Sequence, residues 1–124
     1  MKVYVLRVMA DYGGMLNAGL CLLHCTVGPV LLAFLSVRQH SSELWEGVFL
    51  VMSGLLVAVA TWRMSSVGLR LGLWGFFGVF VAAGLLSESY PWLELVQYAA
   101  SVGLMGTHLL NLRYSRRCIA HAGR

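Results

Sequence analysis

Residues 71–87, LGLWGFFGVFVAAGLLS, form an apolar run without a single Lys, Arg, Asp or Glu. A helix needs roughly 17 to 25 mainly apolar residues to cross a hydrocarbon core about 30 Å thick. Comparable charge-free stretches occur at residues 12–37, 47–62 and 95–112. Four such runs in one short chain predict four membrane-spanning segments.

The composition agrees with that prediction. Of 124 residues, 59% are hydrophobic and only 11% are charged, with a mean hydropathy of +0.76, which is unlike a soluble domain. The runs are continuous rather than alternating, and backbone groups that face lipid must pair within their own segment, so helices are expected. We therefore predict an all-α membrane protein, a four-transmembrane-helix bundle forming a single domain over residues 1–124. The expected spans are roughly 14–37, 44–63, 69–87 and 92–112, followed by a short basic cytoplasmic tail, 113–124.

The basic residues predict the orientation, because short cytoplasmic loops are enriched in Lys and Arg. They lie in the N-terminal segment, the second linker and the C-terminal tail: Lys2, Arg7, Arg63, Arg70, Arg113, Arg116, Arg117 and Arg124. The first and third linkers together hold Arg38 against four glutamates. Both termini are therefore expected in the cytoplasm. Basic residues spread over three chain segments do not resemble a nucleic-acid groove, so no nucleic-acid partner is expected.

Small residues recur at helical spacing in the third and fourth runs. Gly68 and Gly72 are four residues apart, as are Ala99, Gly103 and Thr107. Such spacing places small side chains on one face, where helix backbones can approach closely. We expect these two runs to pack through these faces.

The first run contains two thiols. On a helix, Cys21 and Cys25 are i and i+4, about 5 to 6 Å apart at Cβ, and His24 lies three positions after Cys21. Pro29 has no N–H and cannot bond the carbonyl four residues back, which is that of Cys25. A kink and a freed carbonyl are thus expected beside the thiol pair, with Asn17 extending the polar stripe toward the cytoplasm.

The last run contains the partner groups, His108 and Asn111. If the last helix ends near Leu112 and the first begins near Gly14, His108 and Cys21 lie about 6 Å and about 10 Å inside the boundary. These similar depths predict a metal site of Cys21, His24, Cys25 and His108. Asn17 and Asn111 would then act as second-shell or entry groups on the cytoplasmic side.

Two further features lie at the cytoplasmic end. Cys118 and His121 in the tail are candidates for a relay that receives the ion. Asp11 lies at the expected start of the first helix, where a carboxylate favours the positive end of the helix dipole. That electrostatic explanation is sufficient for Asp11 without a metal.

The stretches DYGGMLNAGLCLLHCTVGP (11–29) and THLLNLRYSRRC (107–118), together with four spans, resemble the MerC family of small inner-membrane mercury-resistance proteins. The CxxHC spacing of Cys21, His24 and Cys25 resembles a subgroup of that family. The resemblance implies a multi-pass protein of the bacterial inner membrane in which the first-span cysteine pair takes up Hg(II) and passes it inward. It also implies a cytoplasmic metal acceptor or reductase as a partner.

The residue types leave the ion open. Thiolate with imidazole suits soft or borderline ions, such as Hg(II), Cu(I) or Zn(II), rather than Mg²⁺ or Ca²⁺. The ion would be bound or transported, and no tightly held cofactor is expected. The remaining expected partners are membrane lipid and, because four short spans are few to enclose a pathway, a second copy of the chain.

Two alternative functions fit the same residues. His24 and His108 could be axial ligands of a haem in a small membrane cytochrome. Cys21 and Cys25 could cycle as a disulfide in a thiol redox protein, although a bridge within one helix is constrained. An enzyme is not expected, because the four charge-free runs (12–37, 47–62, 71–87 and 95–112) contain no carboxylate, Lys or Arg that could act as acid, base or clamp.

Overall fold

The computed structural model describes residues 2–35, 42–62 and 64–123. Its regular elements are four helices: α1 (Lys2–Leu35), α2 (Ser42–Thr61), α3 (Val67–Leu86) and α4 (Leu93–Ala122). The all-helical prediction is thus confirmed for the described part of the chain. Residues 36, 37 and 63 of the expected spans, and Arg38, Arg63 and Arg124 of the charge pattern, lie outside the described residues.

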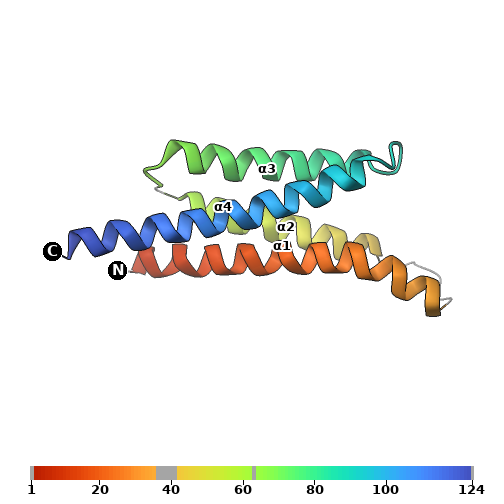
Figure 1. The fold of residues 1–124 in the computed structure, drawn as a ribbon, viewed down its shortest axis with the longest axis horizontal. Helices are drawn as coiled ribbons and strands as arrows, with labels where there is room; N and C mark the ends of the chain where they lie inside the picture. Colours follow the sequence, from red (N-terminus) through yellow and green to blue (C-terminus); the bar gives the residue numbers. More distant parts are fainter. Residues whose placement is uncertain (1, 36–41, 63, 124) are drawn as a thin grey trace.

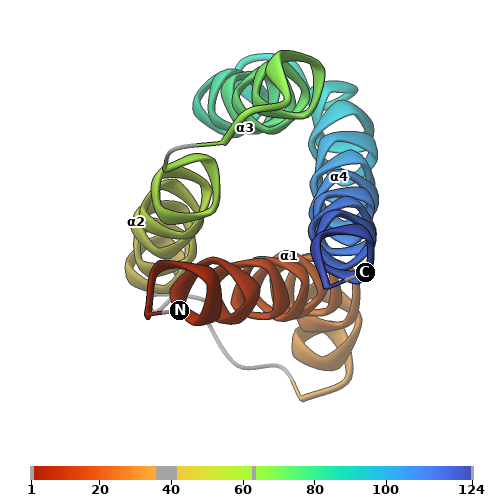
Figure 2. The same cartoon turned by 90° about the vertical axis from the view of Figure 1, so that its left-hand side faces the viewer.

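The helices surround a common axis in the order α1, α2, α3, α4, as the end-on view in Figure 2 shows. Packing is extensive between α3 and α4, α1 and α4, and α1 and α2, and much sparser between α2 and α3. The N-terminus of α1 and the C-terminus of α4 lie at the same end of the bundle (Figure 1). This shared end is what the orientation prediction requires, whichever side of a membrane it faces.

The predicted close packing of the third and fourth helices is present at two of the expected positions. A Cβ added to Gly72 would lie 3.2 Å from Cγ2 of Thr107, and one added to Gly103 would lie 2.8 Å from Cζ of Phe76. Gly68 and Ala99, at the ends of the same stripes, are exposed instead. The small residues therefore allow close approach of α3 and α4 in the middle of the contact.

Large apolar side chains face outward on every helix. Leu16 of α1, Val51 of α2, Leu71 of α3 and Leu95 of α4 are each more than 60% exposed, with values of 65%, 63%, 66% and 71%. By length and composition alone, α3 is the one described helix apolar enough to cross a membrane, and residues 47–61 of α2 form a shorter apolar segment. The outward apolar surface is what a bilayer would cover.

Helix α1 begins at Lys2, about three turns before the expected start of the first span. Asp11 consequently lies well inside the helix rather than in its first turn, and its side chain is completely buried. The dipole explanation for Asp11 is therefore wrong. The basic tail is helical, because α4 continues to Ala122.

Candidate metal site and the buried polar layers

The cysteine pair lies on the inner face of α1. Cys21 is 4% exposed and belongs to the apolar core of the bundle, and Cys25 is half-buried and packs against that core. Since α1 is helical through both residues, the two thiols point to one face about 5 to 6 Å apart at Cβ. A thiol pair in this position can bind an ion within the bundle, away from water.

The carbonyl freed by Pro29 has a specific partner. The Tyr98 hydroxyl of α4 donates a hydrogen bond to the backbone oxygen of Cys25, with an O···O distance of 3.2 Å. The last turns of α1, coloured orange, turn away from the line of the rest of the helix (Figure 1). The end of α1 therefore bends, and Tyr98 links the Cys25 carbonyl to α4.

His24 faces a different neighbour. Its half-buried ring lies against Phe49 of α2, with ring centroids 5.8 Å apart and an interplanar angle of 46°. The imidazole thus lies at the border between α1 and α2, on one side of the thiol stripe.

His108 is 2% exposed and pairs with Asp11 of α1. Its Nδ1 lies 3.0 Å from Oδ1 of Asp11, and Nδ2 of Asn111 donates to Oδ2 of the same carboxylate at 2.7 Å. Both carboxylate oxygens are therefore engaged by α4. Gly14, one turn after Asp11, leaves the space that the His108 ring occupies, because a Cβ there would overlap the ring.

This pairing places His108 apart from the cysteines. The His108 ring lies beside Gly14 of α1. Gly14 precedes Cys21 by seven residues, which is about 10 Å along a helix. Among residues 2–35, 42–62 and 64–123, no three His, Cys, Asp or Glu side chains are arranged to hold one metal ion. The structure therefore does not bring Cys21, His24, Cys25 and His108 together. The depth estimate takes Gly14 and Leu112 as helix ends, whereas α1 starts at Lys2 and α4 continues to Ala122. These depths therefore do not give the level of His108, which lies at Asp11 and Gly14.

Asn17, which lies between Gly14 and Cys21 on α1, forms a further polar contact between helices. Its Nδ2 donates to Oγ of Ser53 at 2.7 Å and to the backbone oxygen of Phe49 at 3.2 Å. Asn17 therefore joins α1 to α2, while Asn111 joins α4 to Asp11. Both asparagines hold helices together in this structure.

The structure has two buried polar layers: Asp11 with His108 and Asn111, and Asn17 with Ser53. Asp11 and Ser53 are not identified from the sequence as members of these layers. The missed signal is the spacing of Asp11, Gly14, Ala18 and Cys21, which recurs every three to four residues and marks one helix face. Extending the first helix back past Gly14 would have placed the carboxylate on the thiol stripe.

The tail residues Cys118 and His121 are exposed on α4. Cys118 lines a pocket of about 150 Å³ at the end of the bundle where the termini lie, together with Arg7 of α1.

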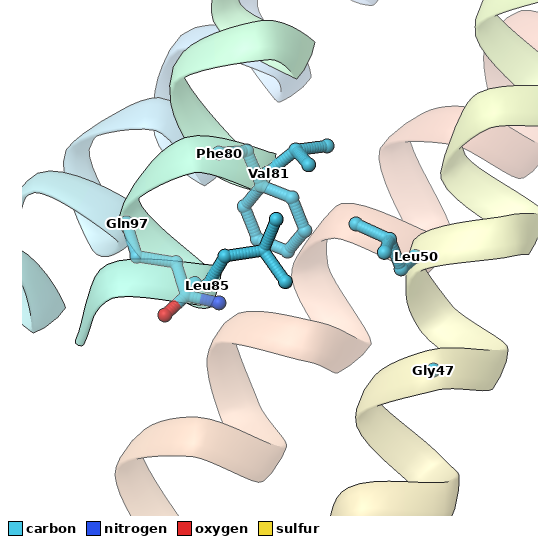
Figure 3. Close-up of a pocket in the computed structure, with 7 residues that line it drawn as sticks. Gly47, Leu50, Phe80, Val81, Leu85 and Gln97 are labelled. Carbon is cyan, nitrogen blue, oxygen red and sulfur yellow. The ribbon is translucent and has the colours of Figure 1, made fainter. Parts of the chain in front are cut away.

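A second pocket, of about 240 Å³, lies between α2 and α3 near the other end (Figure 3). Apart from the amide of Gln97, the side chains that line it are apolar, among them Leu50, Phe80 and Leu85. It lies between α2 and α3, the neighbouring helices that pack most sparsely, and none of its side chains is a thiol, imidazole or carboxylate.

In the described part of the chain, the structure is an all-helical bundle with large exposed apolar side chains and with one buried and one half-buried thiol on α1. The chain matches the family described as MerC mercury resistance protein over residues 11–113. The protein belongs to this family of mercury-resistance membrane proteins. Comparisons with curated proteins and with solved structures gave no match.

Proposed function

We propose that the protein spans the bacterial inner membrane with four helices and both termini in the cytoplasm, and that it takes up a mercuric ion through Cys21 and Cys25. The observation that carries the proposal is the thiol pair, one buried and one half-buried, a helical turn apart on the inner face of α1. Family membership supports mercury as the ion, and Cu(I) and Zn(II) are the competing soft or borderline ions.

The surroundings of the pair favour a divalent soft ion. A charged group buried in an apolar bundle is costly unless it is neutralised. Two thiolates balance the two charges of Hg(II), so the complex of Cys21 and Cys25 with the ion is neutral. Each thiol loses its proton on binding, because the thiolate is the ligand form. His24, which directly precedes Cys25 in the chain, is a candidate to take such a proton.

Four spans are consistent with where the polar groups lie. Asn17, His108 and Asn111 are buried, so these polar groups within the proposed spans are not presented to lipid. Large apolar side chains are exposed on all four helices. Polar groups within spans usually face the bundle interior in this way.

Passage of the ion inward would end at the tail. Cys118 and His121 lie on the exposed end of α4, beyond the polar layer of Asp11, His108 and Asn111. A carrier that holds the ion by two thiols releases it by stepwise thiol exchange, and Cys118 is the thiol at the end where the termini lie. In this role His108 and Asn111 hold α4 against α1 rather than bind the ion.

The test is titration of the purified protein in detergent with Hg(II), Cu(I) and Zn(II), with the metal content measured after desalting. We expect one tightly held Hg(II) per chain in the wild type and loss of that ion in both Cys21→Ser and Cys25→Ser. Cys118→Ser, the matched control, should retain it and slow only delivery of the ion to a cytoplasmic acceptor. Retention by both first-helix variants would refute the site.

The same sample tests the haem alternative. Two axial histidines would have to face each other across the iron, but His24 lies against Phe49 and His108 is held by Asp11. We therefore expect no Soret band in the visible spectrum. A Soret band lost in His108→Ala would overturn the transport proposal in favour of a cytochrome.

A further inference from the structure

The pocket beside Cys118 combines a thiol with an unusual set of polar groups. Its lining comes from α1, from the connection between α2 and α3, and from α4. The lining residues are Tyr4, Arg7, Ser65, Tyr114, Ser115 and Cys118. Two tyrosines, two serines, an arginine and a cysteine therefore line a space of about 150 Å³. That space is large enough for a small organic molecule and not only for a bare ion.

Arg7 is the residue that makes this pocket favour a negatively charged ligand. Its Nε is buried and has no hydrogen-bond partner within the described part of the chain. The nearest carboxylate along α1, that of Asp11, already accepts hydrogen bonds from His108 and Asn111 through both oxygens. A buried guanidinium N–H without a partner is costly, and a planar carboxylate is the group that guanidinium binds best.

Further cations surround this end of the bundle. Arg113 and Arg117 line a neighbouring pocket of about 300 Å³, and Arg116 donates from Nη2 to the Tyr12 hydroxyl at 2.6 Å. Clustered positive charge raises the local concentration of small anions. Arg7 differs from these arginines because it lines the same pocket as the thiol.

We propose that this pocket binds the carboxylate of a small thiol compound on Arg7 and so directs that compound's sulfur to Cys118. The proposal rests on the function proposed above and names the class of molecule that removes the ion: a low-molecular-weight thiol that carries a carboxylate. The incoming sulfur forms a new bond to the metal, the bond from the metal to Cys118 breaks, and the incoming thiol's proton passes to the Cys118 sulfur. The exchange involves no change in oxidation state.

The pocket can be tested without any metal, by alkylation of Cys118 in the full-length protein. The Cys118 sulfur displaces iodide from either iodoacetate, which carries a carboxylate, or iodoacetamide, which does not. Mass spectrometry of the Cys118 peptide gives the two rates. We expect Arg7→Gln to lower the iodoacetate-to-iodoacetamide rate ratio about tenfold, the effect of losing one charge-assisted contact. Arg7→Lys, which keeps the charge without the guanidinium fork, should give an intermediate ratio.

Arg113→Gln is the matched control, because it removes a cation from the same end of the bundle but not from this pocket. Its rate ratio should stay within about twofold of the wild type at 0.15 M salt, where exposed charges are screened beyond roughly 8 Å. An unchanged ratio in Arg7→Gln, or an equal fall in Arg113→Gln, would overturn the carboxylate subsite.

A mercury-transfer experiment then tests whether a small thiol that carries a carboxylate accepts the ion from the protein. Protein loaded with Hg(II) is mixed with mercaptoacetate or with 2-mercaptoethanol, and the ion that leaves the protein is measured over time. We expect mercaptoacetate to remove the ion faster, and the advantage to disappear in Arg7→Gln and in Cys118→Ser. An equal advantage in all three proteins would refute the acceptor role. Failure of the wild type to bind Hg(II) would refute the proposed function instead, while the alkylation ratio would still report on the pocket.

Discussion

Gly14→Ala is the substitution for which the structure gives the most definite expectation. The new Cβ would lie 2.8 Å from Cδ2 of His108 and closer still to its Cε1 and Nε2. The ring cannot simply retreat, because its Nδ1 is held by the buried carboxylate of Asp11. Either α1 and α4 separate or the pairing of His108 with Asp11 and Asn111 is distorted.

The expected cost follows from these contacts. Overpacking of a filled site costs about 1 to 3 kcal/mol, and a distorted hydrogen bond between membrane helices costs about 1 to 2 kcal/mol. Replacing glycine with alanine inside a helix returns about 1 kcal/mol. We therefore expect Gly14→Ala to lower the free energy of unfolding by about 1 to 4 kcal/mol.

The assay is unfolding of the purified protein by SDS in mixed micelles, followed by circular dichroism. Gly106→Ala in α4 is the control, because a Cβ there meets no atom within 4 Å. It should be as stable as the wild type or more so. In a His108→Ala background the added cost of Gly14→Ala should vanish, since the ring is gone. Equal stability of Gly14→Ala and Gly106→Ala would refute the described packing of His108.

Three further predictions concern the links between helices and the orientation. Tyr98→Phe removes the hydroxyl that donates to the Cys25 carbonyl and should cost about 0.5 to 1.5 kcal/mol in the same assay; an unchanged stability would mean that this carbonyl does not depend on Tyr98. Asn17→Leu leaves the Ser53 hydroxyl without its donor and should cost about 1 to 2 kcal/mol, and a stability gain would contradict the α1–α2 contact described here. Green fluorescent protein fused to either terminus should fluoresce and alkaline phosphatase should be inactive at both; opposite results at the two ends would exclude an even number of spans.

The helices could be predicted from the sequence because charge-free runs of sufficient length have few alternatives in lipid. The freed carbonyl of Cys25 could be predicted as well, since it follows from the missing N–H of Pro29 alone. Its partner Tyr98 could not, because nothing local in the sequence tells which residue of α4 lies opposite. The relative shift of two helices along their axes is decided by tertiary packing.

The same reason explains why the candidate site was only partly predicted. The thiol pair is local to one helix and needed only the helical period. To place His108, one must know how far α4 is shifted along α1. That shift is set by the contacts of His108 with the carboxylate of Asp11 and with the space at Gly14. Asp11 was treated as a residue of the helix end, because the apolar run was assumed to mark the start of the helix.

The most direct test of the central claim is X-ray absorption at the mercury edge of the Cys118→Ser protein loaded with one equivalent of Hg(II). We predict a first shell dominated by two sulfur atoms, from Cys21 and Cys25, and loss of this two-sulfur shell in Cys25→Ser, which no longer holds the ion tightly. A first shell of nitrogen and oxygen, unchanged by loss of either cysteine, would contradict the account and move the site to other residues.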